Sequence, residues 1–191
     1  MAFDCFKKDY SKPSRDYGSH GEGESFKPVW GFINPHTEKA PGASNPRNKV
    51  SEYQYGVLMK KHHNFPLEFR DDGGVSGAAK RLKAQGITAS VENHKNAYNK
   101  QVNGAEILII RGDKLSLQYA EMILDSFSML YPKINNRGVK KMSKGGRGFN
   151  NLKAAKGAGM DVALLTEMFF IDAFYLEPQL MAEFWKKALI S

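Results

Sequence analysis

The sequence predicts an α/β protein, because short apolar runs of strand type alternate along the chain with segments whose apolar residues recur at helical spacing. The clearest strand covers residues 104–111, G-A-E-I-L-I-I-R, and its near-continuous apolar run is typical of a strand buried on both faces. The clearest helix covers residues 114–130, which carry one apolar face and stop before Pro132. A length of 191 residues with 41% hydrophobic residues suits one domain with one core.

The N-terminal half follows from local signals in chain order. Residues 1–27 are polar and form a predicted extension, and residues 28–191 form the predicted folded domain. The β-prone run 27–34 predicts the first core strand, with Pro28 at its start. A helix is predicted at 49–64, with Ser51 as a candidate cap and with His62 and His63 as solvated residues at its end. The run 66–70 then predicts a short strand, 75–85 a helix and 87–91 a buried strand.

The C-terminal half contains a basic, glycine-rich stretch at 134–148, which we interpret as a solvated loop. Its spacing fits neither the P-loop nor the dinucleotide-binding fingerprint, since no strand feeds directly into it and no Gly-Lys-Ser/Thr follows. Residues 162–166 predict the last core strand. Residues 176–190 predict a C-terminal helix whose apolar face packs on the body through Leu180, Met181, Phe184 and Leu189.

Four polar residues stand near the ends of these elements. His36 is the second residue after the first strand, Glu52 lies in the first turn of the 49–64 helix, His94 follows the 87–91 strand, and Glu167 follows 162–166. Each has a simpler reading alone: a histidine near a strand end is commonly a hydrogen-bonded structural residue, and Glu52 could merely complement the helix dipole. In α/β folds, however, the carboxyl ends of strands are where sites are built.

Two imidazoles and one carboxylate, with one open position, are the usual protein ligands of a catalytic zinc ion. His36, Glu52 and His94 supply that set from separate elements. Zinc lowers the pKa of a bound water and polarises a carbonyl, but amide hydrolysis also needs a group that takes the water proton and returns it to the leaving nitrogen. Glu167 is our candidate for that group, because its apolar neighbours should raise its pKa toward the working range.

The composition limits the environment and the partners. A net charge of +8 and a pI of about 9.4 favour polyanionic partners such as nucleic acid, anionic membrane or cell-wall polymer. Cys5 is the single cysteine, so no internal disulfide can form. The sequence has no secretory-type apolar run, and no stretch approaches the roughly 20 apolar residues of a spanning helix.

The order and content of several blocks resemble the zinc-dependent N-acetylmuramoyl-L-alanine amidases, which cut peptidoglycan and include phage endolysins. The resemblance covers about residues 29–171. Its blocks are I-N-P-H-T-E-K-A-P-G-A with His36, the helix-opening Glu52, H-K-N-A with His94, the Gly104-x-Glu106 strand start, N-R-G-V-K at 136–140, and T-E-M-F-F-I-D with Glu167. The chain departs from the family at Pro-His-Thr-Glu, where Gly-His-Gly-Gly is usual, and Glu38 there could compete for the metal.

The resemblance implies a three-layer α/β fold with a mixed, mostly parallel sheet of about six strands and helices on both faces. It implies Zn²⁺ held by His36, Glu52 and His94, with Glu167 as the catalytic carboxylate and residues 28–191 as a catalytic domain without a separate cell-wall-binding domain. Asn96 and Arg137 are the candidate substrate-binding residues. For Asn96 we expect a role in holding the His94 loop, and for Arg137 a structural role remains open.

The implied substrate is peptidoglycan, at the bond between N-acetylmuramic acid and L-alanine. The basic charge and the lack of an export signal favour an endolysin made in the host cytoplasm that reaches the wall at lysis, and we expect a monomer. Two alternatives stay open: another zinc peptidase or amidohydrolase acting on stem peptides, and a non-enzymatic nucleic-acid-binding protein. No nucleic-acid partner is expected, because the basic residues are scattered and no nucleic-acid-binding motif is present.

Overall fold

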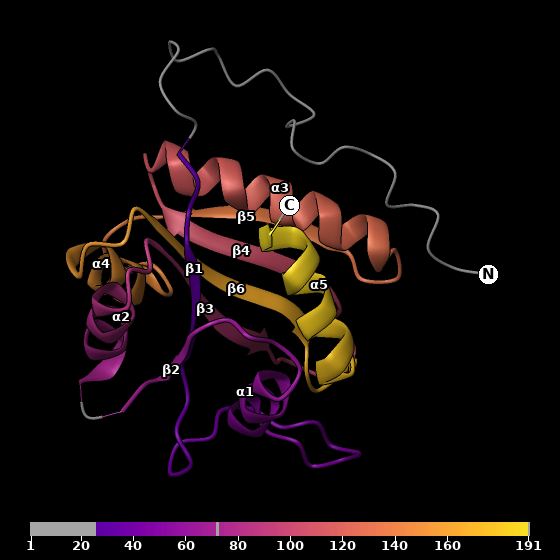
Figure 1. The fold of residues 1–191 in the computed structure, drawn as a ribbon. Helices are drawn as coiled ribbons and strands as arrows, with labels where there is room; N and C mark the ends of the chain where they lie inside the picture. Colours follow the sequence, from indigo (N-terminus) through magenta and orange to yellow (C-terminus); the bar gives the residue numbers. More distant parts are fainter. Residues whose placement is uncertain (1–25, 72, 191) are drawn as a thin grey trace.

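The computed structural model describes residues 26–71 and 73–190. They form a six-stranded sheet with helices on both faces, so the predicted α/β class and the mixed, mostly parallel sheet are confirmed (Figure 1). The elements in chain order are β1 (Trp30–Asn34), α1 (Glu52–Lys60), β2 (Leu67–Phe69), α2 (Gly74–Ala84), β3 (Ala89–Asn96), β4 (Ala105–Ile110), α3 (Lys114–Leu130), β5 (Asn136–Met142), α4 (Phe149–Gly157), β6 (Val162–Phe170) and α5 (Pro178–Ile190).

The strands lie in the order β2-β1-β3-β6-β4-β5, and all neighbours run parallel except the β4–β6 pair. The connection from β3 to β4 covers only residues 97–104, which is too short for the crossover that a parallel return needs. β4 therefore runs back against β6. As a result, one edge of the sheet contains the carboxyl ends of β1, β3 and β6 together with the amino ends of β4 and β5. We call this edge, which lies across the strand ends, the site edge.

Each face of the sheet carries its own apolar core. One core joins β-strand residues to α1, α3 and α5, with Tyr55, Phe127 and Trp185 among its fully buried side chains. The other joins the opposite face to α2 and α4, which lie side by side at the left of Figure 1. Leu82 and Leu152 are buried in that second core. The helices on both faces thus cover the apolar side chains of the sheet, and polar side chains gather at its site edge.

The central strands extend further than predicted. β3 continues to Asn96 and β6 continues to Phe170, because the two strands stay paired through His94↔Glu167 before a register shift. The expectation that His94 and Glu167 follow their strands is therefore wrong, since both lie within them. The polar end of β3 remains a strand because a neighbour continues to accept its backbone hydrogen bonds.

The prediction of a loop at 134–148 is also partly wrong, because this segment contains β5 at Asn136–Met142. β5 is an edge strand paired with β4, and all of its residues are exposed or half-buried. A sequence of lysines and arginines with a glycine is typical of a loop, but an edge strand tolerates it equally well.

Two further details differ from expectation in the first and last helices. α1 is shorter than predicted, and His63, expected in solvent, is only 6% exposed. In α5, Leu180 is 43% exposed and does not pack on the body as predicted, whereas Met181 and Phe184 do. Of the predicted N-terminal extension, residues 1–25 lie outside the described part of the chain. Within the described residues, none of the helices has the length and apolar character needed to cross a bilayer.

Candidate metal centre

The structure brings the three predicted ligand residues together at the site edge. His36, Glu52 and His94 each offer one ligand atom, and these atoms all lie within 4.8 Å of one another. His36 Nε2 is 3.1 Å and His94 Nδ1 is 3.8 Å from Glu52 Oε2, and the two imidazole centroids are 5.3 Å apart. Residues separated by up to 58 positions in the chain thus converge on one point.

Each ligand residue is positioned by its own element. His36 follows β1, where the side chain of Asn34 accepts a weak hydrogen bond from the His36 backbone N–H at 3.4 Å and donates to the carbonyl of Tyr53. Glu52 opens α1 directly after the N-cap Ser51, which forms a reciprocal capping box with Gln54. The predicted cap at Ser51 is therefore confirmed, and it fixes where the helix places Glu52.

The loop between β1 and α1 passes close to these side chains. Gly42 has φ +76°, and a Cβ there would lie 2.8 Å from the His36 ring and 2.9 Å from Glu52 Oε1. Only glycine allows both the left-handed backbone and this approach. The next residue, Ala43, donates its backbone N–H to Glu52 Oε1 at 3.0 Å, so this loop also holds the carboxylate in place.

The carboxylate of Glu52 is 6% exposed and strongly anchored. Its Oε2 accepts the backbone N–H of Lys95 at 2.9 Å and faces His36. Burial alone would raise the pKa of Glu52, but the hydrogen bond and charge of His36 and the backbone N–H groups of Lys95 and Ala43 together lower it. Glu52 is thus held in the charged form that a cation needs.

The donor set fits a divalent metal of the zinc type. An ionised carboxylate offers about four lone-pair positions, so Glu52 retains acceptor capacity beyond its two backbone hydrogen bonds. The side chains of His36 and His94 are 21% and 18% exposed, which leaves one side of the cluster open to solvent. Two imidazoles, one carboxylate and an open side match a catalytic rather than a closed structural zinc site.

Glu167 lies beside this cluster. It pairs with His94 on β3 and with Glu106 on β4, so three polar side chains form one row across three strands. Glu167 is 7% exposed, and within the described residues its Oε2 has no hydrogen-bond partner. Burial raises the pKa of Glu167 to about 7, and the charges of Glu52 and Glu106 act in the same direction, against His94 and Arg147. A carboxyl with this pKa can both accept and return a proton near neutrality.

The two predicted substrate-binding residues meet at Glu106, the next member of that row. Asn96 Nδ2 lies 3.4 Å from Glu106 Oε1, and Arg137 Nε donates to Glu106 Oε2 at 3.1 Å. Arg137 also lies over the Phe170 ring at 5.4 Å and remains 40% exposed. Asn96 is therefore part of a hydrogen-bonded group within β3 rather than of a loop. A substrate contact by Arg137 stays a prediction.

Three residues near the site carry signals that sequence patterns did not single out. Arg147 pairs with Glu106 from the glycine-rich stretch before α4, adding a second cation beside Glu167. Lys95 is 2% exposed with its Nζ 4.4 Å from the Tyr55 ring, and burial lowers its pKa to about 7, against the opposing charges of Glu52 and Glu167. Glu92 is buried and contacts His94. For Glu92 and Lys95 the visible signal was a run of polar residues that continues a strand, which is costly unless each is satisfied.

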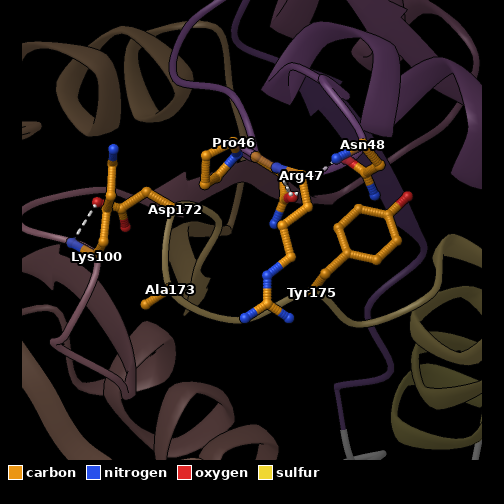
Figure 2. A pocket seen from close by; sticks show the side chains of 8 residues that line it. Pro46, Arg47, Asn48, Lys100, Asp172, Ala173 and Tyr175 are labelled. Carbon is orange, nitrogen blue, oxygen red and sulfur yellow. Dashed lines mark hydrogen bonds between the residues drawn. The ribbon is translucent and has the colours of Figure 1, made fainter.

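A separate pocket of about 400 Å³ opens where the loops after β1, β3 and β6 meet (Figure 2). Arg47 extends its guanidinium between Ala173 and Tyr175, and Asp172 accepts the backbone N–H of Lys100 at 3.0 Å. None of the three metal-cluster residues lines this pocket. We therefore treat it as distinct from the metal centre. Glu38, the possible competitor for the metal, is exposed in the β1–α1 loop and is not a member of the cluster.

Comparison with known proteins identifies the fold. Neither a protein-family model nor a curated protein sequence matches this chain. Among solved structures, the N-acetylmuramoyl-L-alanine amidase AmiC2 of Nostoc punctiforme aligns with a TM-score of 0.60 at 18% identity, over 85% of this chain and 95% of that one. The catalytic domain of the CD27L endolysin targeting Clostridia difficile aligns with a TM-score of 0.62 at 21% identity, over 85% and 97%.

An N-acetylmuramoyl-L-alanine amidase from Clostridium difficile 630 aligns with a TM-score of 0.63 at 16% identity, over 86% of this chain and 96% of that one. The high coverage on both sides means that most of the described fold corresponds, not a fragment. At these identities the likeness establishes the fold. The chain therefore has the three-layer fold of these amidases, as its sequence blocks predicted.

Proposed function

We propose that this protein is a zinc-dependent N-acetylmuramoyl-L-alanine amidase, which hydrolyses the amide bond between N-acetylmuramic acid and L-alanine in peptidoglycan. The observation that carries the proposal is the convergence of His36, Glu52 and His94 beside the buried carboxyl of Glu167. The amidase fold of the chain and the order of its sequence blocks support the same reaction. The basic charge suits an anionic wall.

Zinc held by His36, Glu52 and His94 would supply Lewis acidity toward the scissile carbonyl and toward the attacking water. The protein supplies the proton transfers. Glu167 Oε2, which is free of hydrogen bonds to described residues, accepts a proton from the attacking water. The resulting carboxylic acid then donates this proton to the leaving nitrogen of L-alanine as the carbon–nitrogen bond breaks. The carboxylate of Glu167 is thereby regenerated.

Glu106 and the two arginines bonded to it take no part in the proposed proton transfers, but they place positive charge near the site. Arg137 and Arg147 together carry one more positive charge than Glu106 neutralises, and both remain partly exposed. Glu106, to which both arginines bond, lies on the strand next to Glu167. We propose that this excess positive charge attracts the anionic wall polymer to the cleft and that Arg137 contacts the glycan or the stem peptide there.

The test combines metal content with product identity. We expect purified protein to contain about one zinc ion per chain by elemental analysis. Glu167→Gln should keep the metal and the fold but lower the rate of sacculus digestion by about 10²–10⁴-fold, the usual contribution of a general acid–base group. Full activity in that variant would end the proposed mechanism.

Mass spectrometry of the released fragments separates the amidase from the alternative hydrolase. New free amino termini on L-alanine support the amidase. New termini within the stem peptide instead identify a peptidase that uses the same metal centre, and strong salt-dependent DNA binding without bound zinc would favour the nucleic-acid alternative.

We further propose that the enzyme acts as a phage endolysin, made in the host cytoplasm and released to the wall at lysis. The likeness to an endolysin catalytic domain supports this role. Expression in a bacterial host should leave cells intact until the inner membrane is permeabilised, and permeabilisation should then cause rapid lysis that Glu167→Gln prevents. Lysis without permeabilisation would argue against this route. We also propose a monomer, which sedimentation of the purified chain can check.

A further inference from the structure

Glu92 lies on β3 two residues before His94, so both side chains point to the same face of the sheet. Glu92 is 4% exposed. Its Oε1 is 3.0 Å from His94 Nε2 and 2.8 Å from Nδ2 of Asn151, which belongs to α4. A hydrogen-bonded chain therefore runs from α4 through Glu92 to the imidazole at the metal centre.

The chemistry of a carboxylate settles the direction of the hydrogen bond to His94. An ionised Glu92 can only accept, so the shared proton must reside on His94 Nε2. A neutral imidazole carries one N–H, and with Nε2 protonated its other nitrogen, Nδ1, keeps a free lone pair. Nδ1 is the nitrogen that faces the cluster, at 3.8 Å from Glu52 Oε2.

We infer that Glu92 is a positioning residue for the metal: it holds His94 in the tautomer and orientation that present Nδ1 to the ion, and Asn151 holds Glu92 in turn. The inference rests on the proposed metal site and adds a residue that contacts neither the ion nor the substrate. Histidine ligands commonly donate their second ring N–H to a carboxylate, which fixes the ring and increases its basicity.

The surroundings of Glu92 favour this role over a general structural one. Burying a carboxylate is costly unless it is paired and hydrogen-bonded. In the described part of the chain, Glu92 accepts hydrogen bonds from the His94 ring and from the neutral amide of Asn151, and no Lys or Arg pairs with it. A carboxylate placed only to attach α4 to the sheet could be replaced by a neutral acceptor without loss. The negative charge of Glu92 becomes stabilising when His94 binds a metal cation.

The test measures zinc affinity directly, by competition with a chromophoric chelator, and needs no amide cleavage. Glu92→Gln keeps the size of the side chain and removes its charge and its acceptor-only character. We expect zinc to dissociate about 10–100-fold more readily from this variant, the usual cost of losing such a partner. Asn151→Ala should weaken zinc binding in the same direction by a smaller factor. Glu68→Gln on β2, whose carboxylate pairs with Arg81 away from the cluster, is the matched control and should leave zinc affinity unchanged.

Two further measurements separate positioning from simple stability. Urea unfolding of the chelator-treated proteins should give Glu92→Gln a midpoint no lower than that of the unaltered protein. Burial alone would lower the pKa of His94, but Glu92 and the other nearby carboxylates raise it overall, so nitrogen-15 NMR of the metal-free protein is recorded at a pH where its imidazole is neutral. It should then report His94 protonated at Nε2, and a mixture of tautomers in Glu92→Gln. Equal zinc affinity in both proteins, or a neutral His94 that carries its proton on Nδ1 in the unaltered one, overturns the inference while leaving the amidase proposal intact. No zinc binding by the unaltered protein overturns both.

Discussion

His63 offers a quantitative test of how burial controls charge in this fold. The ring is 6% exposed and lies 5.3 Å from Phe32 and 5.6 Å from Phe65, centroid to centroid. Its Nδ1 accepts the backbone N–H of Phe65 at 3.2 Å, while Nε2 has no partner in the described residues. Burial lowers the pKa of His63 to about 4, and the charges of Lys186 and Lys60 add to the effect.

The pKa difference fixes both the sign and the size of the pH dependence. In the unfolded chain His63 binds a proton near its usual pKa of 6.5, whereas the folded protein resists it until about pH 4. The stabilising contribution is therefore complete above pH 6.5 and is lost as the pH falls from 6.5 toward 4. A pKa difference of this size corresponds to about 3 kcal/mol in full, of which about 2 kcal/mol is lost by pH 5.

The variant His63→Asn removes the titration and retains an acceptor near the Nδ1 position for the Phe65 N–H. Its free energy of unfolding, measured by urea denaturation in the presence of a chelator, should be lower at pH 7.5 because ring packing is lost. Between pH 7.5 and pH 5 it should decline by about 2 kcal/mol less than that of the unaltered protein. His62→Asn, at the exposed neighbour, should follow the unaltered protein. Parallel pH profiles for His63→Asn and the unaltered protein would refute the reasoning.

Three other substitutions test how the site is built. Gly42→Ala should destabilise the fold by about 1–3 kcal/mol because alanine at φ +76° is strained, and it should weaken zinc binding in a chelator titration because its methyl group would displace His36. Ser51→Ala should cost about 0.5–2 kcal/mol in urea unfolding and also weaken zinc binding, since the cap positions the adjacent Glu52. Trp185→Ala should lower the free energy of unfolding by about 3–5 kcal/mol, because the ring is fully buried, while the folded fraction retains its zinc.

The fold was largely predictable because its central elements have simple patterns. β4 is apolar at nearly every position and α3 repeats its apolar residues at helical spacing, and both were found close to their true bounds. The three candidate ligand residues were singled out because the carboxyl ends of parallel strands meet at one edge and His36 and His94 stand near two such ends. The structure confirms that these residues converge, as their types and their places in the predicted elements indicated.

β5 and the buried His63 were missed for a different physical reason. Whether a lysine-rich segment is a strand depends on whether a neighbour offers backbone hydrogen bonds, and β4 provides them to β5. Likewise, His63 lies beyond the end of α1 and is buried because it packs against Phe32 of β1 and Phe65, not because of any local sequence pattern. Both outcomes depend on tertiary partners that a local window does not contain.

The second half of β3 belongs both to the central sheet and to the candidate site. Residues 92–96 are all polar, yet they continue a central strand, with Glu92 and His94 on one face and Asn93 and Lys95 on the other. These polar side chains are held by neighbours on other elements. Asn93 and Lys95 contact Met59 and Tyr55 of α1, Glu92 accepts a hydrogen bond from α4, and Asn96 contacts Glu106 of β4. Removing one partner leaves a buried polar group unsatisfied, which costs more than the hydrogen bond itself contributes. The polar end of β3, which carries His94, therefore depends on contacts from α1, α4 and β4 to remain part of the sheet.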